Sequence, residues 1–117
     1  MDSKLPYKIY SGIITQSGTS NPTINVLQNT TGGTVSIARS STGVYFATLT
    51  GASFTSGKTF CLQNMGVFMG TLNTDTPFRI EFSYTTSNFT LYTNKTSTNT
   101  LTDGLLEGLY FEIRVYP

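Results

Sequence analysis

Few side chains in this chain could perform acid–base or nucleophilic chemistry. It has six acidic residues, one cysteine and no histidine. Without histidine there is no imidazole base, no Ser-His-Asp triad and no histidine metal ligand. A single cysteine excludes an intramolecular disulfide and a cysteine-rich zinc site. Because Cys61 lies between Phe60 and Leu62, we expect a small buried hydrophobic residue rather than a reactive thiol.

The acidic residues are the remaining candidates, since a carboxylate pair can hydrolyse glycosidic bonds. Glu81 and Glu112 are the only acids inside predicted strands, and each alternates with an arginine on the face opposite the predicted core. This pattern favours surface charge pairs. Asp2, Asp75 and Asp103 lie in separate polar segments without a calcium-loop pattern. We therefore predict no catalytic, cofactor-binding or metal-binding residue and no enzymatic activity.

Aromatic residues offer a second kind of site, because sugar-binding modules stack sugars on exposed rings. The chain has no tryptophan but seven tyrosines. Six of them lie in or near predicted strands: Tyr10, Tyr45, Tyr84, Tyr92, Tyr110 and Tyr116. Tyrosine in strands more often packs at the rim of a sheet, with its hydroxyl in water. A glycan site therefore stays open as the less favoured interpretation.

The composition restricts the partners. Charged residues make up 11% of the 117 residues, and the net charge is +1. The seven basic residues are scattered, so we expect no nucleic-acid binding. No apolar run approaches a membrane span, and the N-terminus has no signal-peptide pattern, which predicts neither a membrane protein nor standard secretion. A weakly charged surface suits contact with other proteins, although threonine-rich β-proteins commonly have one.

Short runs of Val, Ile, Thr, Tyr and Phe, bounded by Gly, Asn, Ser and Pro, predict strands rather than helices. The predicted strands are 7–16, 23–28, 34–39, 44–50, 58–63, 67–72, 78–84, 88–93 and 109–115. We expect hairpins between 34–39 and 44–50 and between 78–84 and 88–93, and a bulge at Gly12. This pattern predicts an all-β fold, an antiparallel β-sandwich or jelly-roll-like barrel of about 8–9 short strands. Residues 1–6 would form an N-terminal arm and 7–117 a single domain.

Alternation along these strands predicts which side chains form the core. The expected core residues are Ile9, Ile13, Val26, Val35, Ile37, Val44, Phe46, Phe60, Leu62, Phe68, Phe78, Ile80, Phe82, Leu91, Leu109, Phe111, Ile113 and Val115.

Two further expectations concern the surface. If strands 78–84 and 109–115 are neighbours, Arg79 can meet Glu112 and Glu81 can meet Arg114 across them. The polar, threonine-rich segment 94–103 is expected to be an exposed loop, and Thr93 to Thr102 an exposed contact loop.

Residues 7 to about 51 carry a pattern of strands and turns. It consists of Tyr7-Lys8-Ile9-Tyr10, a turn Thr15-Gln16-Ser17-Gly18-Thr19-Ser20-Asn21-Pro22, the run Val26-Leu27-Gln28-Asn29-Thr30-Thr31-Gly32-Gly33, and a hairpin with Gly43-Val44-Tyr45 and Leu49-Thr50-Gly51. This pattern resembles small β-rich structural proteins and fibre modules of tailed phages that infect Bacteroidetes, including the crAss-like group. The second half of the chain carries no such resemblance.

The resemblance implies a non-enzymatic virion protein that is assembled in a host cytoplasm. The first expectation is a capsid auxiliary or decoration protein that binds the major capsid protein or other virion proteins and its own copies as a homo-oligomer. The alternatives are a head- or tail-fibre module that recognises a host surface glycan, and a bacterial carbohydrate-binding or adhesion module. The resemblance supplies no catalytic residue.

Overall fold

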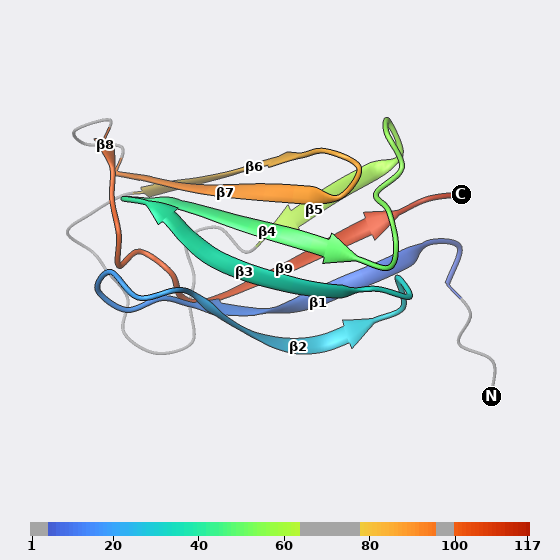
Figure 1. Ribbon diagram of the computed structural model, residues 1–117, viewed down its shortest axis with the longest axis horizontal. Coiled ribbons are helices and arrows are strands. Elements are labelled where there is room, and N and C mark those ends of the chain that lie inside the picture. The colour runs from blue at the N-terminus through green and yellow to red at the C-terminus, as the bar shows by residue number, and fades with distance from the viewer. Residues whose placement is uncertain (1–4, 64–77, 96–99) are drawn as a thin grey trace.

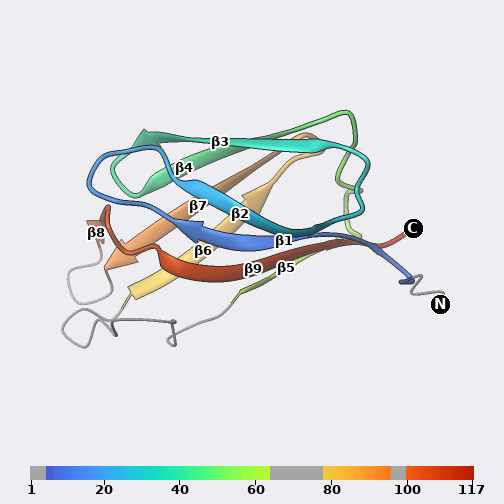
Figure 2. The same ribbon diagram turned by 90° about the horizontal axis from the view of Figure 1, so that it is seen from below.

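The computed structural model of the chain describes residues 5–63, 78–95 and 100–117. These residues form nine strands in two antiparallel sheets that pack face to face as a β-sandwich (Figures 1 and 2). The all-β prediction is confirmed, and of the two architectures expected, the sandwich is found rather than a closed barrel. The described residues include no helix, and therefore none long and apolar enough to cross a membrane.

The first sheet, which we call sheet A, has the strand order β2-β1-β9-β5. Its strands are β1 (Lys8–Thr15), β2 (Thr23–Asn29), β5 (Thr59–Gln63) and β9 (Glu107–Val115). The last strand, β9, lies between the first strand, β1, and β5, so the two ends of the chain are joined by a ladder. The described chain enters β1 and leaves β9 at the same end of the sandwich (Figure 1).

The second sheet, sheet B, has the order β3-β4-β7-β6, with a short strand β8 that pairs with the end of β7. Its strands are β3 (Thr34–Ser41), β4 (Val44–Thr50), β6 (Phe78–Tyr84), β7 (Asn88–Lys95) and β8 (Thr100–Leu101). Both predicted hairpins, β3–β4 and β6–β7, are confirmed. The bulge that Gly12 was expected to mark is present, because the β1–β2 register shifts between Ser11 and Gly12, but its extra residue is Leu27 on β2 opposite. The strand predicted at 67–72 lies outside the described residues.

The C-terminal strand shows how alternation forms the core. Leu109, Phe111, Ile113 and Val115 are buried between the sheets, as predicted. Leu91 of β7 is also buried, and the half-buried Val35, Ile37 and Phe82 pack against the same cluster. The side chains of Phe68, Phe78 and Ile80 lie outside the described part of the chain.

Four of the predicted core residues are instead exposed, namely Val26, Phe46, Phe60 and Leu62. In β4 and β5 the alternation is present, but the core lies on the face opposite to the predicted one. Tyr45, Ala47 and Leu49 of β4 point inward, and Cys61 is the inward residue of β5. Val26 is exposed because β2 is the outermost strand of its sheet.

In β1 the predicted and observed faces are also exchanged. Tyr10 and Ile14 belong to the core cluster. Ile9 and Ile13 lie opposite Arg114 and Tyr110 of β9, on the outer face, although Ile9 is buried there. Ile13, like Val44 of β4, is only half-buried. The core residues that the sequence analysis did not identify are Tyr10, Ile14, Tyr45, Ala47, Leu49, Phe54, Phe89, Leu105 and Leu106.

The predicted charge pairs across strands 78–84 and 109–115 are wrong, because β6 and β9 lie in different sheets. Glu112 instead pairs with Arg114, two residues along its own strand. The exposed-loop prediction for 94–103 is wrong in part. Thr100–Leu101 are exposed, as expected, but they form β8. Thr93, the first residue of the predicted contact loop, is fully buried. Of the predicted arm 1–6, the structure describes Leu5 and Pro6, both exposed.

The β3–β4 turn depends on a glycine for two reasons. Gly43 has a φ of +67°, which favours glycine, and an added Cβ would lie 2.6 Å from the Thr102 amide nitrogen. Gly57 has a similar φ of +75° but open space around its Cβ position. Any other residue would therefore be strained at both positions, but only at Gly43 would its Cβ also press against backbone atoms.

We predict that Gly43→Ala lowers the free energy of unfolding by about 1–3 kcal/mol more than Gly57→Ala, because only the former forces its Cβ against backbone atoms. Gly57→Ala carries only the cost of a left-handed backbone, about 1–2 kcal/mol. Urea unfolding of both variants measures the difference. Equal losses would show that the turn tolerates the added atom.

Candidate functional site

The sequence singled out two strand acids, and the structure separates them. Glu81 is exposed on β6 of sheet B, and Glu112 lies on the outer face of sheet A. They therefore do not form a carboxylate pair. Asp2 and Asp75 lie outside the described residues. Within the described ranges, no group of three or more Cys, Asp or Glu side chains could hold a metal ion.

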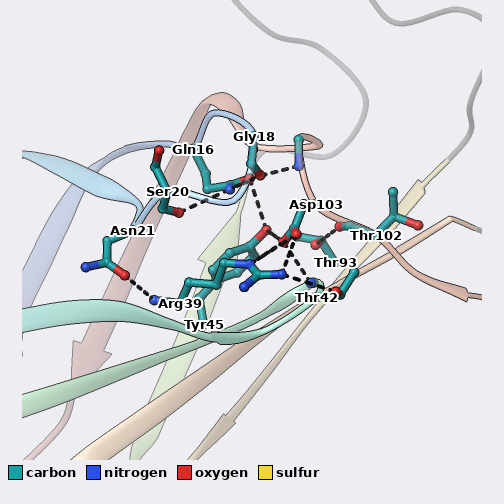
Figure 3. Close-up of polar contacts among 12 residues, drawn as sticks. Gln16, Gly18, Ser20, Asn21, Arg39, Thr42, Tyr45, Thr93, Thr102 and Asp103 are labelled. Carbon is teal, nitrogen blue, oxygen red and sulfur yellow. Dashed lines mark hydrogen bonds and ion pairs between the residues drawn. The ribbon is translucent and has the colours of Figure 1, made fainter.

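Asp103 is the acid that the structure places in a network. It lies in the loop between β8 and β9, and its Oδ2 accepts hydrogen bonds from Arg39 Nη2 at 2.9 Å and Nε at 3.1 Å. Its Oδ1 accepts from the Gly43 amide and from the Tyr45 hydroxyl, each at 2.9 Å. Figure 3 shows these groups converging at one end of the sandwich. We call this cluster, together with Gln16, the Asp103 clasp.

Gln16 completes the clasp from sheet A. Its side chain is buried just after β1, and its Nε2 donates to the carbonyl oxygens of Gly18 and Ser20. Its Oε1 accepts from the Gly104 amide at 2.8 Å and lies 3.1 Å from the Tyr45 hydroxyl. The clasp therefore ties the β1–β2 turn, the β3–β4 hairpin and the β8–β9 loop together (Figure 3).

The electrostatics of the clasp follow from this geometry. Burial alone would raise the pKa of the Asp103 carboxyl. The hydrogen bonds from Arg39, the Gly43 amide and Tyr45 lower it by more than burial raises it, so the pKa lies below its usual value. Burial first, and then the bond to Asp103, raises the pKa of Tyr45 to about 12. Every donor and acceptor described here has a partner within the chain. The clasp therefore has the properties of a structural element rather than of a reactive centre.

Cys61 belongs to a different feature, an apolar cavity of about 300 Å³ between the edges of β5 and β6. Its walls are Phe54, Thr59, Phe60, Cys61, Phe82, Tyr84, Phe89 and Ile113. Burial, with a smaller contribution from Glu112, raises the pKa of the Cys61 thiol to about 12. Cys61 was expected to be a small buried hydrophobic residue, and it is half-buried and packs against the core cluster. Its inward orientation was not expected, because Phe60 and Leu62 were assigned to the core.

The outer face of sheet A carries two exposed apolar side chains on one strand. Phe60 is 55% exposed and Leu62 is 44% exposed, and both point away from the core on β5. The Phe60 ring meets the Tyr116 ring edge-on at 5.8 Å, and Tyr116 lies 5.1 Å from Tyr7. We call Tyr7, Phe60, Leu62, Arg114 and Tyr116 the aromatic patch.

Charged groups hold the patch in place. The Arg114 guanidinium lies over the Tyr7 ring at 4.8 Å and donates to Glu112 at 2.6 Å. Tyr110 donates to the other oxygen of Glu112 at 2.9 Å. The bond from Arg114, more than any other contact, lowers the pKa of Glu112. Arg114 and Glu112 are therefore paired with each other, and the guanidinium contact helps to hold the Tyr7 ring in position.

The tyrosines divide into two groups that the sequence did not distinguish. Tyr10 and Tyr45 are fully buried, contrary to the expectation of rim positions. Tyr110 and Tyr116 lie on the outer face of sheet A, as a rim or surface position predicts. The patch was missed because Phe60 and Leu62 were assigned to the core. Because Cys61, between them, is also apolar, the sequence of β5 does not indicate which of its two faces is exposed to water.

We predict that the native Cys61 thiol is alkylated by iodoacetamide at pH 8 on the order of 100-fold more slowly than in the unfolded chain. The reason is its raised pKa, which leaves little thiolate at that pH. Mass spectrometry of native and urea-unfolded protein measures both rates. Equal rates would show that the thiol is solvated and ordinary.

We predict that Asp103→Asn lowers the free energy of unfolding at pH 7 by about 1.5–3 kcal/mol, because charge-assisted bonds are lost. The folded pKa of Asp103 lies below its unfolded value, so its contribution is complete above the unfolded pKa and is lost as pH falls through the folded pKa. The difference between variant and wild type is therefore expected to shrink below about pH 4.

Glu112→Gln is the matched control for Asp103→Asn, because it also removes a carboxylate that is paired with an arginine. Its partner Arg114 is partly exposed, so we expect a loss of only about 0–1 kcal/mol. Urea titrations over a pH series measure both variants. A loss for Asp103→Asn no larger than that of Glu112→Gln would contradict the role assigned to the clasp.

Comparison with protein-family models, curated proteins and solved structures finds no match to this chain.

Proposed function

We propose that this chain is a non-enzymatic structural protein of a tailed-phage particle, a capsid auxiliary or decoration protein. It binds a protein of the assembled head through the aromatic patch. The observation that carries this proposal is the side-by-side exposure of Phe60 and Leu62 on a sheet face whose neighbouring charges are already paired.

The energetics of docking support the choice of this face. Aromatic residues and arginine are enriched at the centres of protein interfaces, where unpaired charges are rare. Covering Arg114 and Glu112 costs less than covering two unpaired charges, because each already holds the other. The Tyr7 and Tyr116 rings are ordered by their contacts, so less side-chain freedom is lost on binding.

A role without catalysis is supported by the hydrogen bonds that occupy the polar side chains described above. Asp103 and Gln16 are engaged in hydrogen bonds that join loops, and Glu112 is held by Arg114 and Tyr110. The phage context rests on the resemblance of residues 7 to about 51 to virion proteins of phages that infect Bacteroidetes. A virion component needs a compact domain and a contact surface, and both are compatible with this sandwich.

A protein partner is preferred over a glycan because of the ring geometry. A ring that stacks on a sugar offers one open face, and a sugar chain needs several such faces in line. Phe60 and Tyr116 are instead tilted by 79° against each other, and Arg114 covers a face of Tyr7. The fibre and carbohydrate-binding alternatives are therefore less favoured, and the test below includes the results that would support them.

We predict that the purified protein sediments with heads of the phage that encodes it at a fixed copy number, and that mass spectrometry finds it in those particles. The double variant Phe60→Ser/Leu62→Ser is expected to weaken head binding on the order of 100-fold, as loss of interface hot spots does. Phe46→Ser is the matched control. Phe46 is 44% exposed on the outer face of the opposite sheet, and its loss is expected to leave binding unchanged.

Two results would overturn this proposal. One is absence of the protein from particles together with no binding to heads. The other is a stable trimer that ignores heads and binds glycans, which would support the fibre module. A monomer that binds glycans on an array would support the carbohydrate-binding module instead.

A further inference from the structure

The outermost strand of sheet A, β2, is an edge without the usual protection. Exposed edge strands offer unpaired backbone groups to other chains, and proteins guard them with charged residues, proline, bulges or short length. The sequence of β2 is Thr-Ile-Asn-Val-Leu-Gln-Asn, and six of its seven residues are exposed. Val26 is 47% exposed and Leu27 is 54% exposed.

The two edges of sheet B carry charges that β2 lacks. The edge of sheet B at β3 contains Arg39, and the edge at β6 contains Arg79 and Glu81 in its sequence. The other edge of sheet A, β5, has no charge of its own, but it is shorter than β2, with five residues against seven, and it directly follows Lys58. Between Lys8 and Arg39 the chain has no charged residue at all. The only guard within β2 is the bulge at Leu27, which itself places an exposed leucine on the edge.

We propose that two copies of this chain associate through β2, antiparallel about a two-fold axis at Val26, and so join two sheets A into one. This contact goes beyond the proposed docking on a head and does not depend on it, because it uses the edge of sheet A rather than its outer face. In this register Val26 lies opposite Val26 of the second copy, Asn25 opposite Leu27, and Ile24 opposite Gln28.

A second copy is the occupant that this strand fits best. In a two-fold pairing the central residue meets itself, so a charge there would repel its own copy, and β2 has none. The two strands have equal length, and their apolar residues at positions 26 and 27 gather around the axis. A two-fold contact also closes on itself, so it covers the β2 edge of both copies and leaves no β2 edge for a third copy.

Charge substitution at position 26 tests the register directly. By light scattering on a size-exclusion column, we expect the wild type to reach twice the monomer mass of 12.8 kDa with increasing concentration. Val26→Lys and Val26→Glu are each expected to weaken dimerisation on the order of 100-fold, because like charges would meet at the axis. An equimolar mixture of the two variants is expected to restore the dimer, because opposite charges then meet.

Three controls distinguish loss of the β2 contact from misfolding, from a general effect of surface charge and from loss of head docking. Val26 is half exposed, so both variants are expected to fold, and circular dichroism with a thermal scan checks this. Phe46→Lys places a charge at a position of similar exposure on the other sheet and is expected to leave the dimer intact. The Phe60→Ser/Leu62→Ser variant is expected to dimerise like the wild type, so a failure of head docking remains distinguishable.

Three results would overturn the inference: a wild type that stays monomeric at every soluble concentration, a dimer that survives Val26→Lys, or a Val26→Lys and Val26→Glu mixture that remains monomeric. If the mixture of Val26→Lys and Val26→Glu remains monomeric, the two residues at position 26 do not meet across the contact, because opposite charges restore binding only where they are close together.

Discussion

The hydrogen bonds to the Asp103 carboxylate are the interactions that join the turns and loops at one end of the sandwich. The carboxylate accepts them from a guanidinium, a backbone amide and a phenol that belong to two neighbouring strands and the turn between them. A charge that is largely removed from water is tolerable only when its lone pairs are occupied in this way. The same bonds let Tyr45 place its ring in the core, since its hydroxyl ends on the carboxylate. The inward face of β4 is thus determined by a residue almost sixty positions later in the sequence.

This dependence explains what the sequence revealed and what it did not. The core face of β9 was predictable because its buried positions are all large and apolar and its outer positions are Tyr, Glu and Arg. In β4 the two faces offer Val44, Phe46 and Thr48 against Tyr45, Ala47 and Leu49, so hydrophobicity does not separate them clearly. The partner of the Tyr45 hydroxyl favours the second set, and the strand's own sequence does not show that partner. Asp103 itself stands in a polar, threonine-rich segment, where local sequence gives no sign of a long-range contact.

The exposed face of β5 was unpredictable for a related reason. Phe60 and Leu62 are as apolar as any core residue, and alternation cannot tell a buried face from a binding face. The strand pattern, both hairpins and the bulge at Gly12 were predictable, because they depend on neighbours in the sequence. The errors fall where a residue's environment is set by another sheet or by a surface that stays open.

The two proposed contacts rest on different physics, and this difference fits a chain with so few charges. The aromatic patch would bind through side chains whose shape is fixed by ring contacts and by the Glu112–Arg114 pair, so the identity of each residue matters. The β2 edge would bind through backbone groups, for which almost any neutral sequence serves and only a charge or a proline is harmful. A surface that offers both contacts must keep β2 neutral and confine its charges to places where they are paired. The ion pairs of Arg39 with Asp103 and of Arg114 with Glu112 fit this requirement, and β2 itself carries no charge. On this proposal, the low charge of the chain serves the two contacts and is more than a by-product of a threonine-rich composition.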